Sequence, residues 1–98
     1  MATHKEKEQE KLKLLYDIYE QPMYRIAYAI LHHTEQAEDA VSDAFLRILK
    51  NLKKIGDVRS EKTKHYIISI IRSTAINQYR QNQRDSERYT CLLYTSDA

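Results

Sequence analysis

The scarcity of glycine and proline is the feature that most constrains the fold of this chain. Its 98 residues include one Gly and one Pro, so few positions favour the tight turns that join β-strands. A chain of this length forms one small domain with a modest core. Hydrophobic residues make up 42% and charged residues 31%, a balance typical of folded domains. We therefore expect an all-α fold, a small bundle of about four helices.

The N-terminal third of the sequence predicts two helices. Between Lys5 and Glu20, apolar residues recur at helical spacing and form one helix face; they are Leu12, Leu15, Tyr16 and Tyr19. Pro22 suits the first turn of a second helix, where its missing N–H has no partner to lose. The apolar stripe of that second helix is then predicted to be Met23, Ile26, Ala27, Ile30 and Leu31.

The clearest helical period lies between Thr34 and Leu52. Thr34 is a suitable N-cap, and Glu35 in the first turn complements the helix dipole. Gly56 favours the C-terminal end of this third helix. One continuous apolar face runs along it, formed by Ala37, Ala40, Val41, Ala44, Phe45, Ile48, Leu49 and Leu52.

A loop from Gly56 to Thr63 and a fourth helix from His65 to about Gln83 are predicted next. The clustered isoleucines of this segment alone are compatible with a β-strand. The apolar spacing continues for about three turns, however, so length favours a helix. Its apolar face contains Ile67, Ile68, Ile71, Ala75, Gln78 and Tyr79.

The last eight residues, 91–98, depart from this pattern and end without a cap. Their Leu-Leu-Tyr-Thr-Ser run is also encoded by the transposase-adapter DNA sequence CTCTTATACACATCT. We therefore expect a domain over 1–90 and a non-native tail over 91–98, with the natural protein continuing further. A genuine apolar tail is the alternative.

Charge is distributed unevenly along the chain. Residues 1–46 contain five Lys/Arg and nine Asp/Glu, whereas residues 47–88 contain eleven and four. A basic C-terminal half suggests a polyanionic partner, and an acidic N-terminal half suggests a different, basic one. A solvated surface with uneven charge explains the same counts.

Other chemistries find little support in the sequence. Cys91 is the only cysteine, which excludes a disulfide framework and a zinc ribbon. His32 and His33 are adjacent, so they point to different helix faces and do not form an i, i+4 metal pair. No Gly-rich phosphate loop or nucleophile elbow is present. No signal-peptide core or run of ~20 apolar residues occurs either. We expect a cytoplasmic protein that is not an enzyme and needs no cofactor, metal or membrane.

Two exposed helix faces hold the candidate binding residues. On the third helix, a leucine lies within a polar stripe and hints at a protein contact; the stripe is Asp39, Ser42, Asp43, Leu46 and Lys50. The fourth helix combines cations for phosphates, hydroxyls and amides for base edges, and a ring for stacking. This stripe lies opposite Ile71 and Ala75 and is predicted to contain Tyr66, Ser69, Ser73, Asn77, Arg80 and Arg84. A solvated helix face is the alternative.

Two segments resemble the extracytoplasmic-function group of the sigma-70 family of bacterial RNA polymerase sigma factors. The run Ala-Glu-Asp-Ala-Val-Ser-Asp-Ala-Phe-Leu-Arg at 37–47 is similar to the polymerase-binding segment of that family. Tyr66-Ile67 followed by the run Ile-Ile-Arg-Ser-Thr-Ala-Ile-Asn-Gln-Tyr-Arg at 70–80 is similar to its promoter-recognition helix. The match extends over about 12–88, which is essentially region 2. Four positions differ from the usual family residue: Ser42 replaces Gln, Tyr66 replaces Trp, Ser73 replaces Asn and Asn77 replaces Asp. The second domain of the family, a helix-turn-helix that recognises the −35 element, is not among the 98 residues.

The resemblance implies a function in transcription initiation. The stripe from Asp39 to Lys50 would dock on the clamp coiled-coil of core RNA polymerase. The fourth helix and the preceding loop, including Arg59 and Lys62, would hold the −10 promoter element and capture a flipped base of the non-template strand. An anti-sigma factor is a further partner that the resemblance allows. Two other hypotheses remain open: a homeodomain-like DNA-binding regulator, and a helical adaptor that binds only protein.

Overall fold

The computed structural model describes the backbone of residues 4–96 and the side chains of residues 6–86. Its elements, in chain order, are α1 (His4–Leu31), α2 (Thr34–Lys50), a one-turn 3₁₀ helix η1 (Leu52–Lys54) and α3 (Glu61–Ser96). No strand occurs within residues 4–96, which confirms the all-α prediction. These residues form three α-helices where about four were expected.

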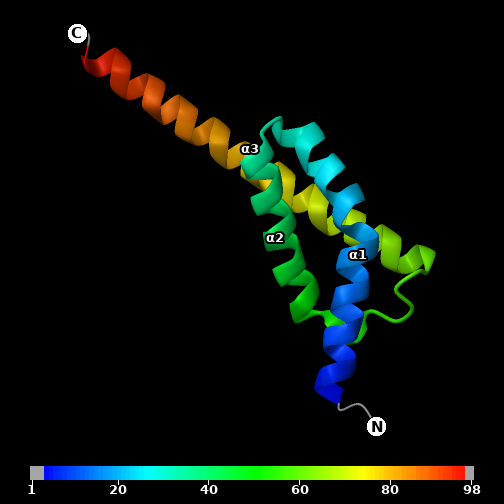
Figure 1. Cartoon of the computed structure of the whole chain (residues 1–98). Helices are drawn as coiled ribbons and strands as arrows, with labels where there is room; N and C mark the ends of the chain where they lie inside the picture. The colour runs from blue at the N-terminus through cyan, green and yellow to red at the C-terminus, as the bar shows by residue number, and fades with distance from the viewer. Residues whose placement is uncertain (1–3, 97–98) are drawn as a thin grey trace.

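The missing helix boundary is the one predicted at Pro22, because α1 continues through this residue. Pro22 has no N–H to donate to the carbonyl of Ile18, a defect that costs roughly 3 kcal/mol inside a helix. The helix axis changes direction near its middle (Figure 1), as prolines inside helices commonly cause. The helix nevertheless continues, because its buried stripe crosses the proline with four-residue spacing: Leu15, Tyr19, Met23, Ala27 and Leu31.

The turn between α1 and α2 differs from its prediction in the capping residue. His32 has a positive φ of 54°, and a histidine is among the side chains that tolerate this region. His33 is the N-cap, and its Nδ1 accepts a hydrogen bond from the backbone N–H of Gln36 at 3.3 Å. The prediction of Thr34 as N-cap is therefore wrong, since Thr34 is the first helical residue.

The C-terminal end of α2 also lies earlier than predicted. The helix ends at Lys50, and Asn51 leads into η1, whose Leu52 is buried together with Ile55. Gly56 does not have a positive φ and does not cap α2. Leu49 was predicted to be buried but is 48% exposed. Because η1 turns the chain, Leu52 and Ile55 fill the core at this end of α2.

α3 begins four residues before the predicted start at His65. The hydroxyl oxygen of Ser60 accepts a hydrogen bond from the backbone N–H of Thr63 at 3.2 Å, so Ser60 caps the helix. The Thr63 hydroxyl in turn donates to the carbonyl of Asp57 at 2.6 Å. The buried stripe of α3 contains Thr63, Ile67, Ile71, Thr74 and Ala75. Of the predicted apolar face, Ile68 and Gln78 are half-buried and Tyr79 is exposed.

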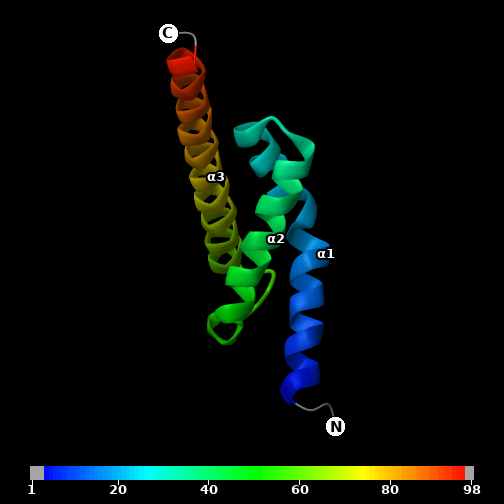
Figure 2. The same cartoon turned by 90° about the vertical axis from the view of Figure 1, so that its left-hand side faces the viewer.

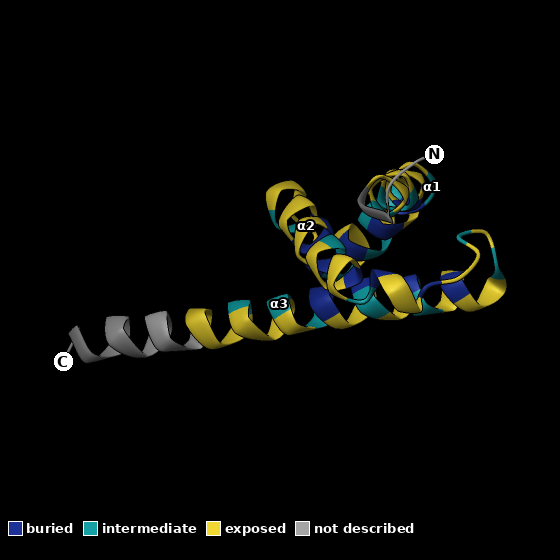
Figure 3. Cartoon of the chain, turned by 90° about the horizontal axis from the view of Figure 1, so that it is seen from below, coloured by how far each residue is buried: buried dark blue, intermediate teal, exposed yellow. Residues whose placement is uncertain are grey.

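The three helices pack around one hydrophobic core. Each of α1, α2 and α3 contacts the other two, and the buried positions concentrate where α1 and α2 face α3 (Figure 3). Figures 1 and 2 show α3 crossing α1 and α2 and then continuing beyond them. The side chains of the expected non-native tail, 91–98, lie outside the described residues, so that interpretation stays a prediction. No helix within the described residues is long and apolar enough to cross a membrane.

Replacing Ser60 with Ala is expected to lower the free energy of unfolding by about 1 kcal/mol, because an N-cap hydrogen bond to α3 is lost. Urea denaturation followed by circular dichroism measures the change. Ser69→Ala is the matched control, since Ser69 is exposed within the same helix and caps nothing. Equal unfolding midpoints for the two variants would contradict the capping role of Ser60.

Candidate nucleic-acid and protein interfaces

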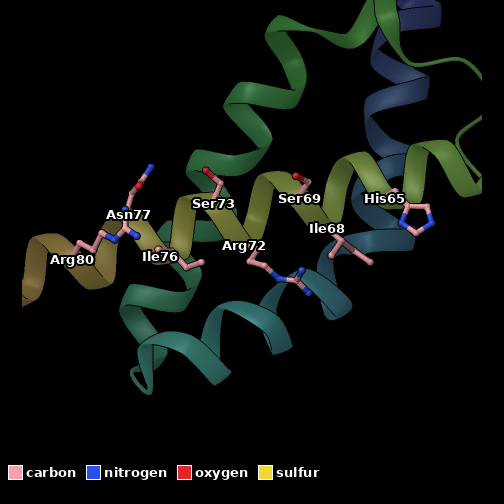
Figure 4. A pocket seen from close by; sticks show the side chains of 8 residues that line it. All are labelled: His65, Ile68, Ser69, Arg72, Ser73, Ile76, Asn77 and Arg80. Atoms are coloured by element: carbon pink, nitrogen blue, oxygen red, sulfur yellow. The ribbon is translucent and has the colours of Figure 1, made fainter.

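The exposed face of α3 forms a shallow groove of about 550 Å³. Four residues predicted from the sequence line it, and all four are exposed: Ser69, Ser73, Asn77 and Arg80. Figure 4 shows the two serines and Asn77 projecting on one side of the helix, with Ile68, Arg72 and Ile76 on the other. The groove therefore presents hydroxyl and amide groups along one edge and a guanidinium with apolar neighbours along the other.

Sequence reasoning missed Arg72 and His65, which also line this groove and are exposed. Arg72 precedes Ser73 and lies about 100° around the helix from it, at the border of the predicted stripe. A predicted stripe wider by one residue would have included Arg72, which lines the groove together with Arg80.

Tyr66 lies in a different place from the one predicted. Its side chain is half-buried and packs against the hydrophobic core, so it is not part of the open stripe. It lines a separate cavity of about 600 Å³ at the N-terminal end of α3. The other walls come from η1, the loop and the first turn of α3: Lys54, Ile55, Gly56, Asp57, Ser60, Lys62 and Thr63. The predicted residue Lys62 therefore lines this cavity, and so does Lys54, which was not predicted.

Arg59 lies in the loop that forms one wall of the cavity, but it does not line the cavity itself. Its side chain is exposed, and its backbone N–H donates to Oδ1 of Asp57 at 3.0 Å. This contact is an Asx turn, which stabilises the loop locally. The guanidinium of Arg59 thus extends from a structured loop into solvent.

Arg84 lies beyond the groove, on the exposed continuation of α3. Three side-chain amides connect this part of α3 to the start of α2. Asn82 donates from Nδ2 to Oε1 of Gln36 at 2.6 Å, and Gln78 donates from Nε2 to Oδ1 of Asn82 at 3.0 Å. These bonds fix the direction in which α3 leaves the core and hence the position of Arg84.

The candidate protein-binding stripe of α2 is exposed at every predicted position: Asp39, Ser42, Asp43, Leu46 and Lys50. Leu46 is 58% exposed. With Ser42 it lines a groove of about 630 Å³ between α1 and α2, whose α1 side consists of Tyr16, Glu20 and Tyr24. A pattern search confined to one helix could not find this α1 contribution.

Tyr16 connects the two sides of this groove. Its ring centroid lies 5.1 Å from that of Phe45 in α2, a distance typical of aromatic pairs. A hydrogen bond to Glu20 and the charge of that carboxylate raise the pKa of Tyr16. The groove thus combines an aromatic floor with carboxylates at its edge. No cluster of potential metal ligands occurs in the described part of the chain.

Residues 15–85 match the model of the Sigma-70 region 2 family, and the chain belongs to this family. The ECF RNA polymerase sigma factor SigX of Bacillus subtilis (strain 168) is 31% identical over 80 residues, which cover 82% of this chain and 40% of that protein. The chain thus spans less than half the length of this relative. The resemblance to the extracytoplasmic-function group is confirmed. No solved structure gives a significant match.

Proposed function

We propose that this chain is the polymerase- and promoter-binding domain of a sigma factor, which holds the −10 element and stabilises its melted form. The observation that carries this proposal is the pair of sites on α3. A groove with hydroxyls, an amide and two arginines lies on the same helix as a cavity lined by Tyr66. Cations meet phosphates, short polar side chains meet base edges, and an aromatic ring stacks on an unpaired base.

In this proposal, the cavity lined by Tyr66 binds the base that is extruded from the DNA stack. Extruding a base from the stack costs a few kcal/mol, and stacking with edge contacts returns ~1–3 kcal/mol per base. The cavity volume of about 600 Å³ falls in the range of small-ligand pockets. Ile55 and Tyr66 supply apolar and aromatic walls, and Lys54 and Lys62, which also line the cavity, supply cations for the phosphate attached to the base.

Strand opening then requires no catalysis by the protein. A domain that binds the melted strand better than the duplex shifts the equilibrium towards melting by its differential affinity. The exposed stripe of α2 supports the second half of the proposal, which is docking on the clamp coiled-coil of core RNA polymerase. Its Leu46 is the type of exposed apolar residue that a protein partner covers.

Substitutions in the groove separate phosphate contacts from base recognition. Arg80→Ala is expected to weaken binding to all promoter fragments similarly and to lower the salt slope by about one, because one phosphate contact is lost. Asn77→Ala is expected to change the preference among −10 sequences by roughly tenfold, because a side-chain contact to a base edge discriminates between bases. Holoenzyme binding to a set of −10 variants at two salt concentrations measures both effects.

Gln81→Ala is the control for these two variants, since Gln81 is exposed on α3 but does not line the groove. If the Asn77 variant shifts the affinity for every −10 sequence by one common factor, base recognition by Asn77 is refuted. Capture of the chain by core polymerase separates the other hypotheses. A homeodomain-like regulator predicts no polymerase binding, and a protein-only adaptor predicts no DNA binding.

A further inference from the structure

The loop before α3 forms one wall of the cavity that Tyr66 lines. This loop is bonded to α1, a helix that does not itself line the cavity. The hydroxyl of Tyr19 donates to the carbonyl of Val58 at 2.7 Å, across 39 residues of sequence. Nζ of Lys11 donates to the carbonyl of Ile55, which is itself a cavity residue. Two side chains of α1 therefore fix two carbonyl groups of the loop.

From the other side, the capping residue and the first turn of α3 fix the middle of the same loop. The hydroxyls of Ser60 and Thr63 both donate to the carbonyl of Asp57, at 2.9 and 2.6 Å. The carbonyls of residues 55, 57 and 58 are thus all bonded to side chains. A segment without regular backbone pairing is held in one conformation by these bonds.

The Tyr19 hydroxyl is well suited to donate a lasting hydrogen bond to the loop. Its side chain belongs to the core and is 6% exposed. Burial, followed by the nearby carboxylates of Asp57 and Glu61, raises the pKa of the Tyr19 hydroxyl. The hydroxyl therefore keeps its proton at physiological pH and remains a donor. Its role is not explained by apolar packing alone, because a phenylalanine would fill the same volume.

We propose that Tyr19 and Lys11 are positioning residues that preform the cavity for the flipped base. This inference rests on the proposed function of the cavity. A loop that is ordered before binding avoids the conformational-entropy loss that a mobile loop would incur on capture. Removing either hydrogen bond leaves the α3 side of the cavity, with Lys62 and Tyr66, unchanged but lets the loop sample other conformations. The affinity for an extruded base should therefore fall, while contacts made by the α3 groove persist.

The test uses Tyr19→Phe and Lys11→Met, which remove the donors and keep most of the side-chain volume. The full chain is bound to core polymerase, and its affinity is measured for forked promoter DNA. The DNA carries either an intact base or an abasic site at the captured position. Wild-type holoenzyme is expected to bind the intact fork about tenfold more tightly than the abasic fork. This factor corresponds to the free energy of stacking one base on an aromatic ring. In each variant this ratio should fall to about threefold or less. Binding to the abasic fork should match the wild type.

Tyr28→Phe is the matched control, because Tyr28 is an exposed tyrosine of α1 whose ring lies beside Tyr24 and His32 and which does not line the cavity. It should keep the full wild-type ratio. Circular dichroism and thermal melting establish that the variants are folded. If one variant does not fold, the other still tests the proposal, because the two hydrogen bonds are independent. A wild-type ratio of one would overturn the proposed base capture itself. A tenfold ratio in the wild type that persists in both variants would overturn the positioning role alone.

Discussion

Reversal of both Asp39 and Asp43 to lysine is expected to weaken binding to core RNA polymerase by about 100-fold or more. Both carboxylates are exposed on the face of α2 that also presents Leu46. Each charge-assisted contact that is lost contributes ~1.5–3 kcal/mol, and two such contacts account for this factor. The affinity of the labelled chain for core polymerase, measured by fluorescence anisotropy, gives the result.

The matched control for this variant is the double reversal Glu10→Lys and Asp17→Lys. Both are exposed acids of α1 that do not line the groove between α1 and α2. The control carries the same change in net charge, so it accounts for long-range attraction. Helicity should remain unchanged in both proteins. Wild-type affinity in the Asp39 and Asp43 variant would exclude this face of α2 as the docking surface.

Tyr66→Ala is expected to slow strand opening by up to about 100-fold while closed-duplex binding changes little. Only an unstacked base can use the ring, and stacking contributes ~1–3 kcal/mol per base. The cavity also loses one of its walls when the ring is removed. Permanganate modification of unpaired thymines, followed in time on a −10 promoter fragment, measures opening.

Because Tyr66 also packs against the core, a loss of stability must be separated from a loss of stacking. Tyr66→Phe keeps the ring and should open promoters at nearly the wild-type rate. Thermal melting of both variants measures the change in stability. An alanine variant that opens promoters at the wild-type rate would refute base capture by Tyr66. A phenylalanine variant as slow as alanine would show that the hydroxyl, not the ring, is the essential group.

The helical class and most of the core followed from local periodicity. Ala37, Ala40, Ala44 and Ile48 lie on one face of α2 whatever its partner, and the structure buries all four. Ile67, Ile71 and Ala75 follow the same rule in α3. The exposed stripe opposite them, from Ser69 to Arg84, follows from the same geometry. Side-chain direction repeats every 3.6 residues, so a helix face can be read from spacing alone.

Local rules failed where two local preferences compete. Pro22 favours a helix start, but the apolar spacing across it favours one helix, and α1 is continuous. Thr34 and His33 are both able to cap α2, and the positive φ of His32 places His33 at that position. The boundary expected at Pro22 made the predicted number of helices too high by one, and the predicted cap of α2 was one residue too late. Both boundaries depend on packing between helices.

The sequence by itself determined the helix faces, the charge asymmetry and the two family motifs, because all three depend on residue order and a fixed helical period. Only the tertiary structure decided that Leu49 is exposed, that Tyr66 lines a cavity and that Tyr16 completes the groove beside Leu46. It also decided that Tyr19 bonds to Val58, 39 residues away. Each of these depends on which segments meet in space, and helical spacing specifies the direction of a side chain but not its partner.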